Sequence, residues 1–204
     1  MPDPQQAIFA VVLAAGSASR FGSTKQAAAL GGIALVRRSV LAASKACGNR
    51  VLTVIGHDPV TVYSAMDSRS GFVIVNDDHA AGIGGSIAVA ARALPRSAVA
   101  MLLVLADQPL VTATHLRALI NAWSGAGDEI VATEFAATLG PPVLFPRAAF
   151  TDLASQSGDR GARALLRDRR FRLKSVRFEA AAADVDTPAD LDAIAQKLLH
   201  FGDD

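Results

Sequence analysis

The sequence predicts an α/β fold built on a mostly parallel central sheet. Short apolar runs alternate along the chain with stretches of helical composition, which is the pattern of successive β-α-β units. The run from Ala98 to Ala106 is apolar at every position, as expected of a central strand that is covered on both faces. Because ligands of open α/β sheets sit outside the carboxyl ends of the strands, we expect the functional site at that edge.

The expected strands are apolar runs that end at residues unsuited to extended structure. Gly56 ends the second run, and Asp107-Gln108-Pro109 ends the fourth. The last run alternates apolar and polar side chains, which is typical of an exposed strand. In chain order, the runs cover 8–13, 50–55, 72–75, 98–106, 129–133, 143–145 and 171–178.

The expected helices are recognised by apolar residues at helical spacing and by the residues at their ends. The stretch 112–124 has such an apolar face and a candidate N-cap in Thr112. Pro59 stands in the first turn of one helix, and Pro188 begins the last helix, which Thr187 would cap. In chain order, the helices cover 33–46, 60–66, 84–94, 112–124, 147–154, 162–169 and 188–199.

Length and composition predict one domain, residues 1–204, with a core rich in alanine, valine and leucine. A formal net charge of +1 provides no basic field for nucleic acid, and the arginines within 167–172 are expected to form a solvated face. The single cysteine, Cys47, excludes an intrachain disulfide and a cysteine-rich zinc site. No signal peptide is visible, and the longest apolar run is too short to span a bilayer. We therefore expect a soluble, cytoplasmic protein without nucleic-acid or membrane partners.

The most informative stretch is Val11 to Lys25, VVLAAGSASRFGSTK. An apolar strand leads into a loop of small residues, whose backbone N–H groups a ligand can approach closely. Arg20 and Lys25 would suit a ligand with several negative charges, such as a triphosphate. The spacing of the glycines and of Lys25 excludes a Walker A loop, and G-x-G-x-x-G is also absent. Composition alone leaves open an ordinary turn with solvated basic residues.

Two carboxylates are candidate metal ligands. Asp107 ends the most buried strand, where a carboxylate is costly unless it is paired or bound to a metal. Asp186, in D-V-D-T-P, is a candidate partner, because Mg²⁺ commonly uses one or two carboxylates together with substrate phosphates. Turn and cap chemistry is the alternative explanation of both residues, and in D-V-D-T-P Asp184 and Asp190 could equally contribute to it. From the residues alone, that is the simpler explanation of Asp186.

Three glycine-containing segments add weaker signals. The segment 76–87, NDDHAAGIGGSI, ends in glycines just before a helix, where backbone N–H groups could bind a base or an anion. The segments 140–145, GPPVLF, and 158–163, GDRGAR, are explained by themselves as turns and helix ends. His79 is expected to be a surface or packing histidine.

Together, these motifs resemble the MobA-like nucleotidyltransferase family, and within it the molybdenum cofactor cytidylyltransferase (MocA-like) branch. The D-Q-P, D-x-D-T-P, G-x-P-v-l-F and G-D-x-G-A-R patterns match, and the resemblance covers roughly 8–198. It implies a three-layer Rossmann-like nucleotidyltransferase fold with a mostly parallel central sheet. The opening signature L-A-A-G-x-S-x-R-x-G-x-x-K is filled at every position, by Leu13, Ala14, Ala15, Gly16, Ser17, Ser19, Arg20, Gly22 and Lys25.

The resemblance also implies roles for individual residues. The implied catalytic residues are Arg20, Lys25 and Asp107. Asp107 and Asp186 would bind the metal, Mg²⁺ with Mn²⁺ as an alternative. The implied nucleotide-binding residues are Leu13, Ala14, Ala15, Gly16, Arg20, Lys25, Gly82, Ser86 and Asp107. The implied acceptor-binding residues are Gly140, Pro142, Asp159 and Arg163.

Three positions depart from the family pattern. Asp77 stands where proline is usual, and His79 stands where an aromatic residue is common. Both lie in the segment that reads the base in this family. Pro141 stands where cytidylyltransferase members often have histidine.

The implied reaction is attack by the terminal phosphate of molybdopterin on the α-phosphorus of CTP, which gives a dinucleotide form of the molybdenum cofactor and pyrophosphate. An acceptor phosphate with a second pKa of about 6 is already ionised at pH 7, so no general base is required. L-A-A-G favours CTP, but GTP stays an alternative because the choice depends on one methyl group, at Ala15. Transfer to a sugar or alditol phosphate also stays open, as does a non-catalytic carrier that hands the cofactor to a client such as a molybdenum hydroxylase.

Overall fold

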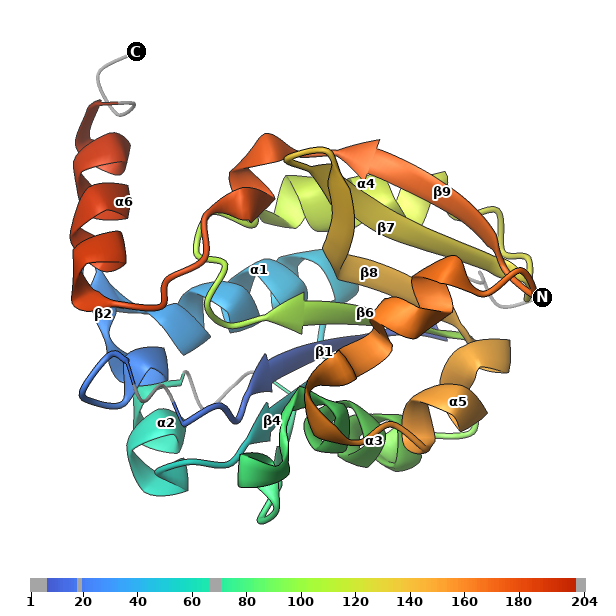
Figure 1. Ribbon diagram of the computed structural model, residues 1–204, viewed down its shortest axis with the longest axis horizontal. Coiled ribbons are helices and arrows are strands. Elements are labelled where there is room, and N and C mark those ends of the chain that lie inside the picture. Colours follow the sequence, from blue (N-terminus) through green and yellow to red (C-terminus); the bar gives the residue numbers. More distant parts are fainter. Residues whose placement is uncertain (1–6, 18–19, 67–70, 201–204) are drawn as a thin grey trace.

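The computed structural model describes residues 7–17, 20–66 and 71–200, without the side chains of residues 160, 199 and 200. Ser19 of the opening signature lies outside the described residues. Seven strands form the main sheet, in the order β5-β4-β1-β6-β8-β7-β9 (Figure 1). The strands are β1 (Ile8–Ala14), β4 (Val51–Ile55), β5 (Phe72–Val75), β6 (Ala100–Leu105), β7 (Glu129–Phe135), β8 (Thr138–Pro146) and β9 (Arg172–Arg177).

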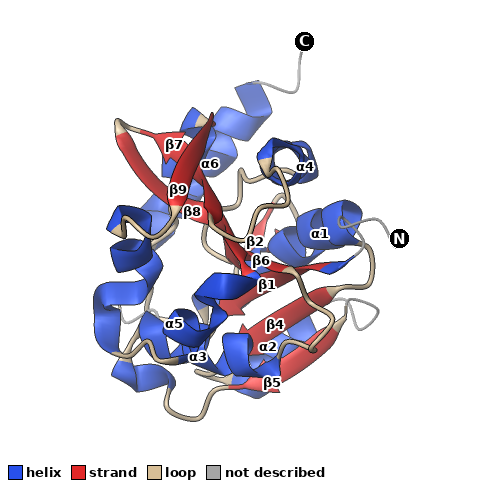
Figure 2. Ribbon diagram, turned by 90° about the vertical axis from the view of Figure 1, so that its right-hand side faces the viewer, coloured by secondary structure: helices blue, strands red, loops and turns tan. Residues whose placement is uncertain are grey.

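The sheet is mostly parallel, as the sequence predicts. Only β8 runs against its neighbours, β6 and β7. Helices cover both faces and make three layers (Figure 2). They are α1 (Leu35–Cys47), α2 (Pro59–Ala65), α3 (Ile83–Ala93), α4 (Ala113–Ala122), α5 (Phe150–Ala154) and α6 (Pro188–His200). Short 3₁₀ turns are η2 (Lys25–Ala27), η3 (His79–Ala81), η4 (Arg147–Ala149), η5 (Gly158–Arg167) and η6 (Glu179–Ala182).

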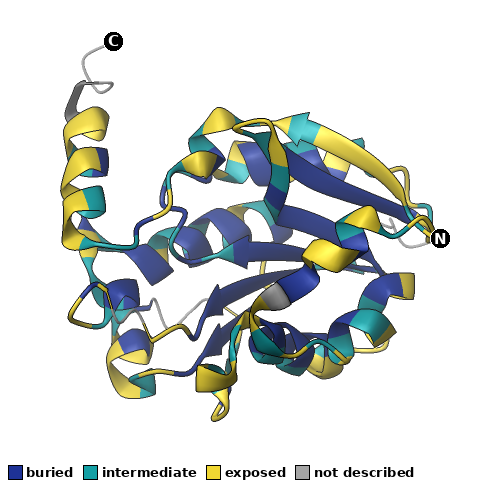
Figure 3. Ribbon diagram, viewed as in Figure 1, coloured by how far each residue is buried: buried dark blue, intermediate teal, exposed yellow. Residues whose placement is uncertain are grey.

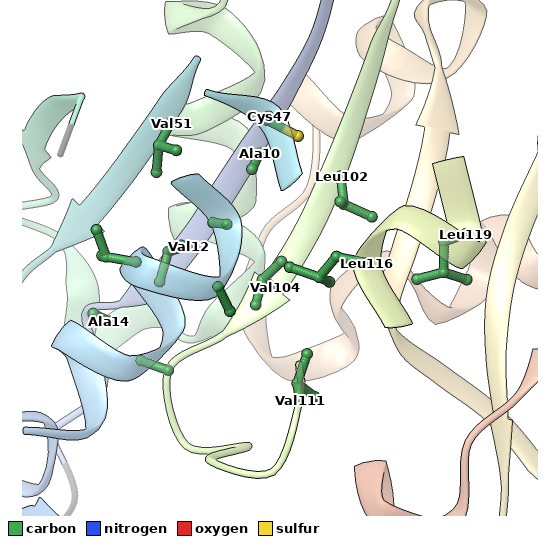
Figure 4. Close-up of a cluster of buried hydrophobic side chains, with 14 of the residues drawn as sticks. Ala10, Val12, Ala14, Cys47, Val51, Leu102, Val104, Val111, Leu116 and Leu119 are labelled. Carbon is green, nitrogen blue, oxygen red and sulfur yellow. The ribbon is translucent and has the colours of Figure 1, made fainter. Parts of the chain in front are cut away.

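The alternation of side chains along β1 separates two cores. Ala10, Val12 and Ala14 face the layer of α1 and α4, where Leu116 and Leu119 of α4 join them (Figure 4). The intervening residues of β1 belong to the opposite core, which α3, α5 and η5 cover. Because both faces of the central strands are buried, the strands are continuously apolar instead of alternating. Figure 3 shows this buried centre, with exposed residues on β9 and α6.

The carboxyl ends of four parallel strands are level with one another. Leu13 pairs with Leu105, and Ala14 pairs with Ile55, which in turn pairs with Val75. The segments that follow these strands therefore begin at one edge of the sheet. This confirms the expectation that 14–16, 77–86 and 107–109 lie together.

Several elements differ from their expected bounds for tertiary reasons. The helix expected over 33–46 begins at Leu35, because Ile33–Ala34 (β3) pairs with Ala29–Leu30 (β2) in a short antiparallel hairpin. β8 extends well beyond 143–145, because β6 and β7 pair with it on both sides. The stretch expected as a helix over 162–169 is a 3₁₀ segment that starts at Gly158 and is interrupted by the positive φ of Gly161.

The expected caps are present. The hydroxyl of Thr112 accepts a hydrogen bond from the backbone N–H of His115, and that of Thr187 accepts one from Asp190. α6 packs through Ile194 against Phe21, Leu30 and neighbouring residues. Within the described residues, no helix is both long and apolar enough to cross a membrane.

Candidate functional site

The loop after β1 is closed by two side-chain hydrogen bonds. The Gln26 amide donates from Nε2 to the carbonyl oxygen of Gly16 at 2.7 Å, which ties the two ends of the loop together. The Thr24 hydroxyl donates to Oδ2 of Asp58 at 2.6 Å, and this bond lowers the pKa of Asp58. Lys25, at the end of the loop, is only 7% exposed. The loop therefore presents its lysine from a fixed position.

The ammonium group of Lys25 joins the two predicted metal ligands. Its Nζ lies 3.0 Å from Oδ2 of Asp107 and 3.2 Å from Oδ1 of Asp186. The guanidinium of Arg20 lies 3.0 Å from the other oxygen of Asp186, Oδ2. Four charged side chains from three separate motifs thus form one cluster.

Backbone and cap contacts hold Asp186 in this place. The N–H of Val185 donates to the carbonyl oxygen of Asp107 at 2.9 Å, which joins the two acidic segments directly. Oδ2 of Asp190 accepts from the N–H groups of Asp186 and Thr187, at 3.0 and 2.8 Å. The cap chemistry expected of D-x-D-T-P therefore belongs to Thr187 and Asp190, and the carboxylate of Asp186 remains directed at Lys25 and Arg20.

A third acid stands beside this cluster. Desolvation of the Asp184 carboxyl group, together with the nearby charge of Asp107, raises its pKa to about 6. The shift reflects mainly the loss of hydration at this carboxyl group, and the negative charges of Asp107 and Asp186 add to it.

A cavity of about 280 Å³ opens beside the cluster, at the carboxyl edge of the sheet. Most of the predicted nucleotide-binding residues line it: Leu13, Ala15, Gly16, Lys25, Gly82, Ser86 and Asp107. Ala14 does not, because its side chain packs in the α1 core. Arg20 also lies outside the lining and meets the cavity only through Asp186.

Two further polar residues belong to this wall, Gln26, which the sequence did not single out, and His79, which was predicted to be a surface or packing histidine. Gln26 lines the cavity as well as closing the loop. The only feature of the sequence that could have pointed to Gln26 is its position directly after Lys25, and its burial became visible only in the structure. His79 lines the cavity too, while its ring packs edge-on against His57 at a centroid distance of 5.7 Å, as a packing histidine would.

The segment predicted to read the base is held by a buried hydrogen bond. Asn76 donates from Nδ2 to the hydroxyl of Ser86 at 3.0 Å, and both residues are 4% exposed. Gly82 is required at its position, since it has a φ of +106° and a Cβ would approach Oδ1 of Asp159 within 2.5 Å. This close approach brings the G-D-x-G-A-R segment against the nucleotide cavity.

A second cavity, of about 240 Å³, adjoins the first and shares Ile83, Leu105 and Asp159 with it. Arg163 and Pro141 also line this second cavity, whose floor is apolar. Two of the predicted acceptor-binding residues, Asp159 and Arg163, therefore lie together in the wall of this second cavity. Gly140 and Pro142 flank Pro141 but do not line the cavity.

Pro142 is held from the other side of the sheet by a buried relay. Its carbonyl oxygen accepts from the Thr133 hydroxyl at 2.7 Å. Because that proton is used, the hydroxyl accepts from Nε2–H of His115 at 2.8 Å. Burial lowers the pKa of His115 to about 4, so the ring is neutral at pH 7. The peptide bond between Pro141 and Pro142 is cis.

The donor set fits a divalent cation that also binds a substrate phosphate. Oxygens of Asp107 and Asp186 converge on one ammonium nitrogen, so they lie close enough to face a common ion. Over 7–17, 20–66 and 71–200, no group of three or more His, Cys, Asp or Glu side chains is arranged to hold a metal. A cation at Asp107 and Asp186 would thus need oxygens from a ligand or water, which is the usual situation of Mg²⁺.

Comparisons with known proteins agree with this fold. PucB of Bacillus subtilis, a purine catabolism protein, is 28% identical over 203 residues, which are 94% of this chain and 97% of PucB. The crystal structure of an Rv0371c homologue from Mycobacterium sp. strain JC1 superimposes with a TM-score of 0.84 at 27% identity, covering 96% of this chain and 98% of that one. Mycobacterium tuberculosis Rv0371c in complex with manganese superimposes with a TM-score of 0.77 at 26% identity, covering 93% and 98%. The model of the MobA-like NTP transferase domain matches residues 10–176, and the chain belongs to this family.

Proposed function

We propose that the protein is a metal-dependent cytidylyltransferase that moves CMP from CTP to the phosphate of the molybdenum cofactor and releases pyrophosphate. One observation carries the proposal. Lys25 lies within 3.2 Å of carboxylates that are 82 and 161 residues away in the sequence, with Arg20 beside them, next to a cavity at the carboxyl edge of the sheet. Two cations beside two carboxylates suit a triphosphate bound together with a metal ion.

The nucleotide would lie in the first cavity. Its base would meet Gly82 and Ser86, and its phosphates would approach the small residues Ala15 and Gly16 of the loop after β1. The absence of large side chains there leaves the backbone N–H groups accessible. The acceptor would enter from the second cavity, where Asp159 and Arg163 would meet it.

In the reaction, an oxygen of the acceptor phosphate attacks the α-phosphorus, and the bond between this phosphorus and the bridging oxygen breaks. The electron pair leaves with pyrophosphate. An acceptor monoester needs no base at neutral pH, since its second pKa is about 6. Lys25 and Arg20 would offset the charge that grows on the phosphoryl oxygens and on the leaving pyrophosphate.

Asp107 and Asp186 would hold the divalent cation. When bound, the cation supplies charge neutralisation and orientation of the phosphates. Rv0371c, a similar protein, forms a complex with manganese, which supports binding of a divalent metal here, and we propose Mg²⁺, with Mn²⁺ as the alternative.

The test is pyrophosphate release by the full chain with Mg²⁺ and molybdenum cofactor, with CTP, GTP, ATP and UTP supplied separately. We expect release with CTP. Release with GTP alone would keep the mechanism but make the enzyme a guanylyltransferase, which is the second candidate because only the methyl group of Ala15 favours CTP.

Parallel reactions with a sugar phosphate and an alditol phosphate test the other acceptor class. If a folded protein releases no pyrophosphate with any nucleotide and acceptor, the enzymatic proposal is refuted and the carrier function is favoured. In that case, molybdenum cofactor should still bind, and it should pass to a molybdenum hydroxylase client.

A further inference from the structure

A third hollow continues the row formed by the two cavities. This outer cleft, of about 570 Å³, is lined by Glu134, Ala137, Thr138, Leu139, Arg163, Leu166, Arg167 and Ser175. It shares Arg163 and Leu166 with the acceptor-side cavity, which in turn shares Ile83, Leu105 and Asp159 with the nucleotide cavity. An acceptor that reaches the nucleotide through the middle cavity would therefore leave its far end at the outer cleft.

The polar groups of the outer cleft form a distinctive set. Oε2 of Glu134, on β7, accepts the hydroxyl of Ser175 on β9 at 2.7 Å. The carboxylate stays available as an acceptor, because it has four lone-pair sites and this bond uses one of them. In the part of the chain that the structure describes, neither Arg163 nor Arg167 forms an ion pair. The cleft thus offers one strong acceptor and two strong donors, with Leu139 and Leu166 as apolar walls.

This set matches one kind of heteroaromatic edge. A 2-amino-4-oxo-pyrimidine edge presents an amino group and a ring N–H side by side, which a carboxylate accepts in parallel, and a carbonyl oxygen to which an arginine donates. The flat faces of such a ring suit apolar walls.

We propose that the outer cleft binds the end of the acceptor that lies farthest from its phosphate, and that this end is a pterin-type ring recognised by Glu134 and Arg167. The inference rests on the proposed function and extends it, because it makes the outer cleft the place where the acceptor is selected. Arg163 lines both the outer cleft and the acceptor-side cavity, so it can contact the acceptor in either of them. Guanine has the same edge. However, the outer cleft shares lining residues with the acceptor-side cavity and none with the nucleotide cavity, so it is placed to bind the acceptor and not the nucleotide base.

The test measures binding of 6-hydroxymethylpterin to the full chain by the change in pterin fluorescence. Glu134→Gln keeps the shape of the side chain but removes one of the two acceptor oxygens, and Arg167→Met removes a donor. We expect each variant to bind the pterin roughly ten-fold more weakly or worse, because hydrogen bonds to charged groups are the stronger class. Asp128→Asn is the matched control, since Asp128 is an exposed carboxylate that pairs with Arg172 and does not line the cleft.

A ring analogue separates recognition from a structural effect. Lumazine, in which oxygen replaces the 2-amino group, should bind the wild type about as weakly as the pterin binds Glu134→Gln, and Glu134→Gln should weaken lumazine binding much less. Pterin affinity that is unchanged in both Glu134→Gln and Arg167→Met would overturn the proposal. Displacement of the pterin by CTP, whose base lacks this edge, would also overturn it, because the ring would then occupy the nucleotide cavity.

Turnover distinguishes this proposal from the reaction on which it rests. With molybdenum cofactor as acceptor, Glu134→Gln should raise the acceptor KM while the KM for the nucleotide stays unchanged. Pterin binding that depends on Glu134, without pyrophosphate release from any nucleotide, would refute the reaction and leave the cleft assignment standing. Turnover with an acceptor KM that Glu134→Gln does not alter would refute the cleft assignment alone.

Discussion

Lys25→Met is the most direct perturbation of the charge cluster. The methionine keeps the unbranched stem of the lysine, whereas the cation that joins Asp107 and Asp186 is lost. The side chain of Lys25 is only 9% exposed, so water cannot easily replace its charge. Removal of one preorganised electrostatic donor in a catalytic site costs about 2.7–4 kcal/mol of transition-state stabilisation. We therefore expect kcat to fall by roughly 10²–10³.

The folded state should tolerate this change better than the reaction does. Arg20 remains beside Asp186, and the carboxylates of Asp107 and Asp186 are 31% and 42% exposed, so water can solvate them. We expect only a small change in Tm, measured by circular dichroism in parallel with pyrophosphate release. Lys45→Met, at an exposed position in the last turn of α1, is the matched control and should keep full activity. A loss of ten-fold or less in Lys25→Met, with an unchanged Tm, would refute the catalytic role.

Four further predictions address the metal, the pH dependence, the glycine contact and the core. Asp107→Asn should weaken Mn²⁺ binding to the nucleotide-free protein, which electron paramagnetic resonance measures, while Asp128→Asn should leave it unchanged. The pKa of His115 is lower in the folded than in the unfolded state, so the unfolded state takes up more protons as the pH falls from about 6.5 towards 4. The free energy of unfolding should therefore drop by up to about 3 kcal/mol over this range and level off below it. Urea titrations of His115→Gln should show a flatter pH profile. Gly82→Ala should lower the free energy of unfolding by at least about 1 kcal/mol and weaken nucleotide binding, because its φ is +106° and Asp159 lies too close, whereas Gly127→Ala should cost little in the same titration. Leu102→Ala should cost about 2–5 kcal/mol in urea titrations, because the side chain is fully buried between the sheet and α4, and a cost below 1 kcal/mol would contradict the assigned packing.

The layered architecture could be predicted because local patterns carry it. Continuous apolar runs mark strands that are buried on both faces, and the positions of β1, β4 and β6 follow from them. Capping residues such as Thr112 act on their own helix, so their effect is visible within a few residues of sequence. The small-residue loop after β1 and the two acidic motifs were recognisable for the same reason, as short segments with unusual composition.

Pairing and close approach required the tertiary structure. Nothing in the apolar run at 143–145 indicates that β8 is long or that it runs antiparallel between β6 and β7, since periodicity encodes which residues are buried and not which strands are neighbours. The cap residue and the metal candidate in D-x-D-T-P were distinguished only by the hydrogen bonds of Asp190 and by the contact between Val185 and Asp107.

The sequence by itself determined the sheet core, the small-residue loop after β1 and the family motifs, because each is a local run of residues whose burial or backbone freedom follows from its composition. The tertiary structure decided which of these motifs act together. Lys25 meets Asp186 across 161 residues, and Glu134 meets Ser175 across 41, through strand order and helix packing. Such contacts depend on the free energy of the whole core, and no single segment of the chain contains that information.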